Sequence, residues 1–271
     1  MTPSQPVAAL VLAGARPGEV DPVARAAGVP FKCLAPIAGR PMVERVVEAL
    51  AELPAVARIL VLADPAARLD KLPAIARARS RGRLELRPPE ATPSTSVRAG
   101  LEAAAGMPLL VTTGDHPLLE RTMLEAFVHP ALASGAAVVV GLAPEPAVRA
   151  VAPTTRRTWW HFRDGRFSGA NLFLLRGEAA RPALAFWRRV EGERKRPWRI
   201  VRLFGPWNLV LYASRLLTLE AAMARASRIL GCRVAAVPIP IGAAAIDVDR
   251  PADLALAEAL LAARPVAGSP S

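Results

Sequence analysis

The chain has 271 residues, 52% of them hydrophobic, so it can bury a large core as one domain or as a domain with an insertion. Its formal charge of +12 reflects either a compositional bias toward Ala, Arg and Pro or an affinity for anions. The charge by itself does not distinguish between these two explanations. The two cysteines, Cys33 and Cys232, have no metal-ligand spacing and argue against a disulfide framework.

The N-terminus does not have the pattern of a signal peptide. The N-terminus, MTPSQPVAAL, lacks the basic region and long apolar stretch of a signal peptide. No apolar run approaches the ~20 residues needed to span a bilayer. We therefore expect a cytoplasmic protein, with peripheral contact to the inner face of the membrane through residues 186–217 left open as an alternative. Its last residues, 264 to 271, are expected to form a frayed Pro, Gly and Ser tail.

The first 50 residues predict a strand, a long loop and a helix. Val7 to Leu12 is an uncharged apolar run that ends at a glycine, which is typical of a short buried strand. A loop rich in Gly, Pro and charge follows and contains Arg16 and Lys32. The helix begins near Pro41, with Met42, Val46 and Leu50 on one face. A strand that leads through glycine and cations into a helix is how α/β folds hold phosphate.

The next hundred residues alternate between strands and helices. We expect strands over 58–63, 84–87, 108–113 and 136–142, a basic surface helix over 65–82, and a helix over 96–105. Ser94, Thr95 or Ser96 could cap that last helix. Asp115 follows the strand that ends at Thr113, and Pro117 is expected to open a helix. Ligands bind at the carboxyl ends of strands in open α/β sheets, so the Asp115 side chain could point into a ligand cleft. The alternative is that Asp115 is the N-cap of the following helix.

A β-ribbon and a helical region follow. Asp164-Gly165 is a turn signal between RTWWHF and RF, and a further strand is expected over 171–175. Residues 186–217 mix Trp and Tyr with many basic residues, which suits a membrane-surface helix, a single-strand nucleic-acid platform, or a plain helical subdomain with inward-facing aromatics. Pro197 and Gly205-Pro206 break the stretch and favour the plain subdomain. His116 is expected to be a loop residue.

The C-terminal part predicts a last strand over 232–241 and a last helix. Asp247 and Asp249 are expected to end a strand, and Pro251 to open a helix with Leu256 and Leu260 on one face. Asp253 is then an acid in the first helical turn, where the helix dipole favours it.

Several segments, taken in order, resemble the signature of one enzyme superfamily. LAGAR (12–16), PFK (30–32) and LAPIAGRPM (34–42) are similar to the loop of the MobA-like and sugar-phosphate nucleotidyltransferases. Ala15 replaces a usual glycine, and Phe31 separates the proline from the lysine. Further segments that match are SVRAGL (96–101), GDHPLL (114–119), SGANLFL (168–174) and DVDRPADL (247–254).

The resemblance implies a role for each matching residue. It implies nucleotide contacts from Leu12, Ala13, Gly14, Ala15, Ser96, Arg98 and Gly114. It implies catalytic roles for Arg16 on the β- and γ-phosphates and for Lys32 on the α-phosphate. Asp115 and Asp247, with Asp249 as the alternative to Asp247, would bind Mg²⁺, and Asn171 would face the acceptor. If residues 186–217 act as a lid over an anionic acceptor, such as a lipid precursor, then Arg194, Lys195 and Arg196 would bind its phosphate.

We therefore expect a three-layer, Rossmann-like α/β sandwich of the GT-A type, with a mostly parallel sheet and an inserted β-ribbon and helical lid. A single domain over 1–263, with the insert over about 145–230, would transfer an NMP from CTP or GTP to a phosphorylated small molecule and release pyrophosphate. The alternatives are a glycosyltransferase that uses a nucleotide sugar, and a non-catalytic protein that binds anions or a membrane surface through 186–217. We expect no nucleic-acid partner, and the oligomeric state stays open.

Overall fold

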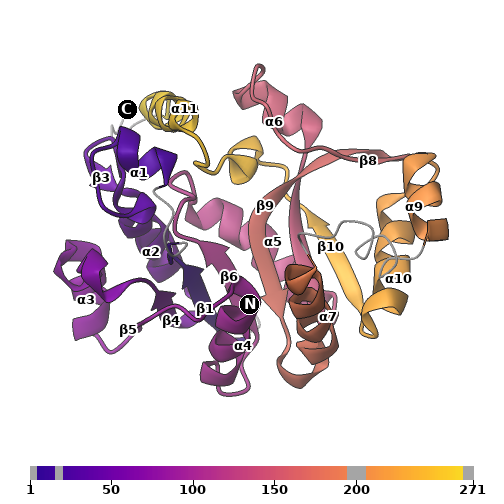
Figure 1. The fold of residues 1–271 in the computed structure, drawn as a ribbon, viewed down its shortest axis with the longest axis horizontal. Coiled ribbons are helices and arrows are strands. Elements are labelled where there is room, and N and C mark those ends of the chain that lie inside the picture. Colours follow the sequence, from indigo (N-terminus) through magenta and orange to yellow (C-terminus); the bar gives the residue numbers. More distant parts are fainter. Residues whose placement is uncertain (1–4, 16–20, 194–205, 265–271) are drawn as a thin grey trace, which may run out of the picture.

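The computed structural model describes residues 5–15, 21–193 and 206–264. In this part of the chain, eight strands form one mixed sheet in the order β10-β7-β9-β6-β1-β4-β5, with β8 paired to β9 (Figure 1). The strands of this sheet are β1 Val7–Leu12, β4 Val56–Leu62, β5 Leu84–Arg87, β6 Leu109–Thr113, β7 Val138–Pro144, β8 Trp160–Phe162, β9 Gly165–Leu175 and β10 Val234–Pro238. Two short strands, β2 Pro36–Ile37 and β3 Arg40–Pro41, pair separately.

The sheet is mostly parallel, as expected. β1 pairs in parallel with β4 and β6, β4 with β5, and β7 with β10. β1 reads as a continuous apolar run because helices cover both of its faces. The antiparallel pairs of the sheet all involve β9, which pairs with β6, β7 and β8.

The predicted β-ribbon exists and extends further than expected. β8 and β9 pair across Asp164-Gly165, the predicted turn. β9 then continues as one strand through Asn171 and lies between β6 and β7 in the sheet. The second strand of the ribbon is therefore also a central strand of the main sheet, and it carries Asn171 toward the end of β6.

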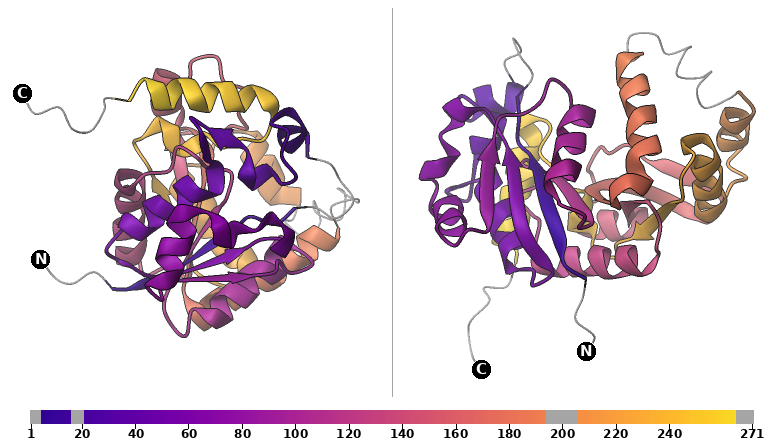
Figure 2. Two further views of the ribbon diagram at one scale, coloured as in Figure 1. Left: turned by 90° about the vertical axis from the view of Figure 1, so that its left-hand side faces the viewer. Right: turned by 90° about the horizontal axis from the view of Figure 1, so that it is seen from below.

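Helices cover both faces of the sheet, which gives the three expected layers. Apolar side chains of α2, α3 and α5 pack on one face, and those of α4 and α7 pack on the other. In Figures 1 and 2, α3 lies at one end of the molecule and α9 and α10 at the opposite end. The helices are α1 Pro22–Ala26, α2 Met42–Glu52, α3 Pro73–Ser80, α4 Pro93–Ala103, α5 Arg121–Ala133, α6 Glu145–Val151, α7 Arg181–Gly192, α9 Pro206–Ala213, α10 Leu219–Leu230 and α11 Pro251–Ala262; the short 3-10 helices are η1 Lys32–Leu34, η2 Pro65–Ala67, η3 Leu69–Lys71, η4 Gly177–Ala180 and η5 Gly242–Ala245.

Four local expectations were wrong. Residues 65–82 form η2, η3 and α3 and not one helix, because Arg68 has a left-handed φ of 49° and Pro73 restarts the chain. The cap of α4 is Thr92, since Pro93 occupies the first helical position. Pro117 opens only a turn, and α5 begins at Arg121. Asp247 and Asp249 follow η5 and lie in a loop, and no strand precedes them directly.

The aromatic and basic segment 186–217 is only partly described. Tyr212 packs inward against Trp160 and Phe162. Trp207 and Val210 of α9 and the following Leu216 are 69%, 56% and 65% exposed. Within the described residues, no helix has the length and apolar content to cross a membrane.

Candidate functional site

The candidate site lies at the carboxyl ends of β1 and β6. These strands are parallel neighbours in which Leu12 pairs with Thr113. The Gly114 N–H donates to the Leu12 carbonyl oxygen at 2.9 Å, so the loops after the two strands start side by side. A Cβ added at Gly114 would lie 2.9 Å from the Ala13 Cβ, which makes glycine necessary for this close approach. The junction brings Ala13 and Gly14 next to the loop that carries Asp115.

Lys32 connects two carboxylates at this edge. Its Nζ lies 2.6 Å from Asp115 Oδ2 and 2.8 Å from Asp249 Oδ1. Burial by itself lowers the pKa of Lys32, but the charges and hydrogen bonds of Asp115 and Asp249 outweigh it and raise this pKa above its ordinary value. Lys32 therefore remains a cation at any physiological pH.

Asp115 and Asp249 have the donor set for a hard divalent cation. Oδ1 of Asp115 is buried and has no hydrogen-bond partner within the described part of the chain, while the Asp249 side chain is 65% exposed. The Val248 N–H donates to the Asp115 carbonyl oxygen at 3.0 Å, which joins the two acidic loops. Among the described residues, no group of three or more His, Cys, Asp and Glu side chains could hold a metal. Two carboxylates fit Mg²⁺, which usually takes one or two protein ligands and completes its shell with water and substrate phosphates.

Asp247 has different partners. Its carboxylate pairs with the Arg157 guanidinium and accepts a hydrogen bond of 2.7 Å from Asn171 Nδ2. Arg157 also donates to the Asp247 carbonyl oxygen at 2.9 Å, and the Arg157 side chain is only 10% exposed. Asp247 thus joins β9, through Asn171, to the loop before β8. Sequence reasoning did not select Arg157, because RRT carries no pattern that separates this arginine from its neighbours.

His116 is buried beside the acidic cluster, with 1% exposure. Its Nε2 lies 3.5 Å from the Ala243 carbonyl oxygen, and its Nδ1 has no partner among the described residues. Burial lowers the pKa of His116, against the opposing effect of the Asp247 and Asp115 charges. The residue is neutral and inaccessible, which agrees with the expectation of a structural loop residue.

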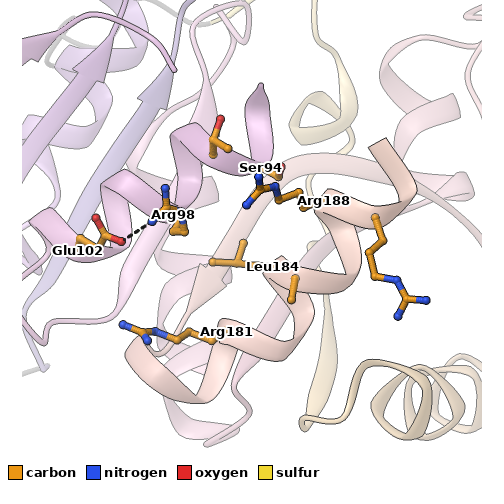
Figure 3. A pocket seen from close by; sticks show the side chains of 9 residues that line it. Ser94, Arg98, Glu102, Arg181, Leu184 and Arg188 are labelled. Carbon is orange, nitrogen blue, oxygen red and sulfur yellow. Dashed lines mark hydrogen bonds and ion pairs between the residues drawn. The ribbon is translucent and has the colours of Figure 1, made fainter. Parts of the chain in front are cut away.

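Ser96 and Arg98 lie on α4, which packs on the sheet face opposite to α2 and α5. Ser96 is buried, and its hydroxyl accepts a hydrogen bond from the Glu90 N–H at 3.1 Å. Arg98 is exposed and pairs with Glu102 at 3.0 Å along the same helix. A cleft of about 640 Å³ lies between α4 and α7. Ser94 and Arg98 of α4 and Arg181 and Arg188 of α7 are among the residues that line it (Figure 3).

An anion from the protein itself already occupies the N-terminus of α4. The Ser94 N–H donates to the Glu191 carboxylate at 3.1 Å, and the Ser94 hydroxyl donates to the same carboxylate. Glu191 comes from α7, so this contact joins the two helices on that face of the sheet. The resemblance implies that this helix start steadies a triphosphate, and the carboxylate shows that it accepts negative charge. Sequence spacing does not indicate this contact.

Some of the remaining predicted site residues lie in the described part of the chain, and others lie outside it. Leu12 ends β1, and Gly14 and Ala15 are exposed in the loop after it. A Cβ at Gly14 would lie 3.0 Å from the Pro89 side chain. Arg16, Arg194, Lys195 and Arg196 lie outside the described residues, so their predicted roles stay predictions.

The chain is similar to known nucleotidyltransferases. A model of the MobA-like NTP transferase domain matches residues 9–231. A hypothetical transferase from Thermus thermophilus is 34% identical, with a TM-score of 0.78 over 92% of this chain and 100% of the other. No curated protein sequence matches this chain.

Two more distant structures share the fold. The 4-diphosphocytidyl-2C-methyl-D-erythritol synthase of Anaerococcus prevotii has a TM-score of 0.57 at 11% identity, over 95% of this chain and 96% of the other. A CMP:2-keto-3-deoxy-manno-octonic acid synthetase complexed with CTP has a TM-score of 0.55 at 17% identity, over 96% and 99%. The predicted nucleotidyltransferase resemblance and fold are confirmed, and the chain belongs to the MobA-like NTP transferase domain family.

Proposed function

We propose that this protein is a Mg²⁺-dependent nucleotidyltransferase that moves an NMP from an NTP to a phosphorylated small molecule and releases pyrophosphate. The observation that carries the proposal is the position of Lys32 between Asp115 and Asp249, at the carboxyl edge of β1 and β6. One cation and two carboxylates beside a glycine-containing loop are the groups that phosphate transfer needs.

Asp115 and Asp249 are the residues that would hold Mg²⁺. Asp115 Oδ1 has no hydrogen-bond partner among the described residues and the Asp249 carboxylate is exposed, whereas both oxygens of Asp247 accept hydrogen bonds from Arg157 or Asn171. We therefore favour Asp249 over Asp247, and we assign Asp247 the task of positioning Arg157 and Asn171. When bound, Mg²⁺ neutralises charge on the phosphate oxygens and orients the reacting groups.

The reaction joins two anions, and this chain's own residues lower the repulsion between them. An oxygen of the acceptor phosphate forms a bond to the α-phosphorus of the NTP. The bond from that phosphorus to the α,β-bridging oxygen breaks, and pyrophosphate leaves with the bonding electrons. Lys32 would turn from its carboxylates toward the α-phosphate and the attacking oxygen, where negative charge accumulates. No general base is required because the acceptor phosphate is already an anion near neutral pH, and His116 is too buried to serve as one.

The nucleotide is proposed to be CTP, with GTP as the second choice. The resemblance of SVRAGL to the cytidylyltransferase branch supports CTP, and so does the shared fold with a synthetase whose structure contains CTP. Leu12 to Ala15, Ser96, Arg98 and Gly114 would contact the nucleotide. Asn171 would face the acceptor, and Arg16 would hold the departing phosphates.

The experiment is a thermal-shift series followed by a pyrophosphate assay. The purified protein is heated with CTP, GTP, UTP or ATP, with and without Mg²⁺, beside Asp115→Ala and the surface control Asp70→Ala. A ligand that binds only the folded state raises the melting temperature by mass action. We expect a Mg²⁺-dependent shift with one nucleotide, absent in Asp115→Ala and retained in Asp70→Ala. Acceptor-dependent pyrophosphate release then supports NMP transfer, whereas transfer from a nucleotide sugar without pyrophosphate would contradict it.

A further inference from the structure

An apolar cavity of about 280 Å³ lies between the sheet and the helices α4 and α7, and it is partly open to solvent at Phe173 and Trp187, which are 38% and 37% exposed. Figure 1 shows these two helices on the same face of the sheet. Its floor is the sheet itself, with side chains from four adjacent strands, β1, β6, β9 and β7. Its roof is Val97 of α4 and the α7 residues Ala183, Leu184 and Trp187. Leu12, Val111, Phe173 and Val140 are among the floor residues, and Phe173 pairs in register with both Val111 and Val140.

One end of the cavity adjoins the candidate site. Leu12 and Thr113 line it and are the last residues of β1 and β6. Asn171 also lines it and donates to Asp247. The other end is formed by Val138 and Leu175, which pair in register at the far side of the sheet from the acids. The cavity therefore extends from the reacting end of β6 under α7, along the strands.

The chemistry of the lining changes along this path. Thr113 and Asn171 supply polar side chains at the end near the acids, and the buried Thr113 hydroxyl has no partner among the residues that the structure describes. Thr112 also borders the cavity, but alternation along β6 directs its side chain to the opposite face. All other lining residues are aliphatic or aromatic. A sugar or polyol carries a hydroxyl on almost every carbon, and each hydroxyl buried here without a partner would cost free energy.

We propose that this cavity binds the hydrocarbon part of the acceptor, so that the acceptor is the phosphomonoester of an aliphatic alcohol and not a sugar phosphate. This inference rests on the proposed function. The phosphate would lie near Lys32, the first polar atoms of the alcohol near Thr113 and Asn171, and the chain between β6, β9 and α7. At about 30 Å³ for each non-hydrogen atom, the cavity accommodates about nine such atoms.

The test measures binding of n-alkyl phosphates from ethyl to decyl phosphate by titration calorimetry, with glycerol 3-phosphate and glucose 1-phosphate as polar references. We expect the dissociation constant to fall about three- to fourfold for each added methylene, the factor for burying one CH₂, and to level off near octyl phosphate. The two polar phosphates should bind more weakly than octyl phosphate. A dissociation constant that does not change with chain length would overturn the proposal.

A matched pair of variants locates the binding. Val140→Phe fills the floor of the cavity and should abolish the dependence on chain length. Val151→Phe makes the same chemical change at the exposed end of α6, where Val151 is 39% exposed, and should leave the dependence intact. If Val140→Phe fails to fold, Ala183→Phe enters the same cavity from α7. Retention of the dependence in a folded cavity variant would show that the chains bind elsewhere and would reject the proposal.

A coupled assay separates this inference from the proposed function. Pyrophosphate release from an NTP with octyl phosphate, but not with glucose 1-phosphate, supports both. Pyrophosphate release with glucose 1-phosphate, but not with octyl phosphate, rejects the aliphatic acceptor and leaves the nucleotidyltransferase intact. Length-dependent binding without pyrophosphate release from any of the four NTPs keeps the cavity as a hydrocarbon site and rejects the proposed function.

Discussion

Lys32 and Asp249 are 217 positions apart in the chain, yet Lys32 Nζ lies 2.8 Å from Asp249 Oδ1. The same nitrogen lies 2.6 Å from Asp115 Oδ2, a residue 83 positions away. Three separate segments thus meet at one ammonium group. The carboxylates hold Lys32 in place when no phosphate is near, and their charge keeps it protonated.

Lys32→Ala should lower turnover much more than nucleotide affinity. In the proposed mechanism the ammonium group acts on charge that develops in the transition state, so its loss should reduce kcat by about 100- to 1000-fold. The dissociation constant of the NTP should change little. Steady-state kinetics and thermal shift with the same nucleotide measure the two quantities. Lys71→Ala, which removes an exposed lysine of η3, is the matched control. An unchanged kcat would remove Lys32 from the mechanism.

Asp249 and Asp247 should respond differently to substitution. Asp249→Asn changes an exposed side chain and should reduce Mg²⁺-dependent activity while leaving the unfolding free energy almost unchanged. Asp247→Asn should instead lower the unfolding free energy by roughly 3 kcal/mol, because it leaves the buried Arg157 charge without its partner. Urea unfolding and a Mg²⁺ titration of activity measure both effects. Equal loss of Mg²⁺ response in the two variants, with equal stability, would argue that both acids bind the metal.

Glu191→Ala should destabilise the contact between α4 and α7. The Glu191 carboxylate satisfies the N–H and hydroxyl of Ser94, which is buried at the start of α4. Loss of a capping acceptor costs about 1 to 2 kcal/mol, measurable as a shift in the urea midpoint. Glu102→Ala removes an exposed ion pair with Arg98 on α4 and should lower the unfolding free energy by less than about 0.5 kcal/mol. Similar midpoints for the two variants would show that Glu191 contributes no more than a surface ion pair.

His116 should make the protein less stable in mild acid. Burial lowers its pKa in the folded state, so below the unfolded value of about 6.5 the unfolded chain binds more protons than the folded one. The stabilising contribution of neutral His116 is therefore complete above that pH and is lost as the pH falls through the lowered folded pKa. Urea unfolding at pH 7.5 and 5.5 tests this. His116→Gln, which cannot titrate, should lose less stability between the two pH values; an equal loss in the wild type and the variant would contradict the prediction.

Much of the local structure could be predicted from the sequence, because it depends on nearby residues. The apolar run of β1, the amphipathic α2, the four residues of β5 and the Asp164-Gly165 turn lie where their patterns indicate. The errors were also local. Pro93 starts α4 three residues before the predicted helix. Pro117 lies in a turn, and the helix that it was expected to open begins only at Arg121.

The sequence by itself determined the layered α/β fold, the family, and the loops after β1 and β6 that carry Gly14 and Asp115. Its periodicity, its glycines and its motifs are properties of short segments. The backbone conformation of such a segment depends mainly on residues that are close together in the sequence. Only the tertiary structure decided that Lys32 meets Asp115 and Asp249, that Arg157 and Asn171 bind Asp247, and that Glu191 of α7 caps α4. Each of these contacts joins residues far apart in the chain. These residues meet because the sheet places β1, β6 and β9 side by side, and that order of strands cannot be predicted from any local pattern in the sequence.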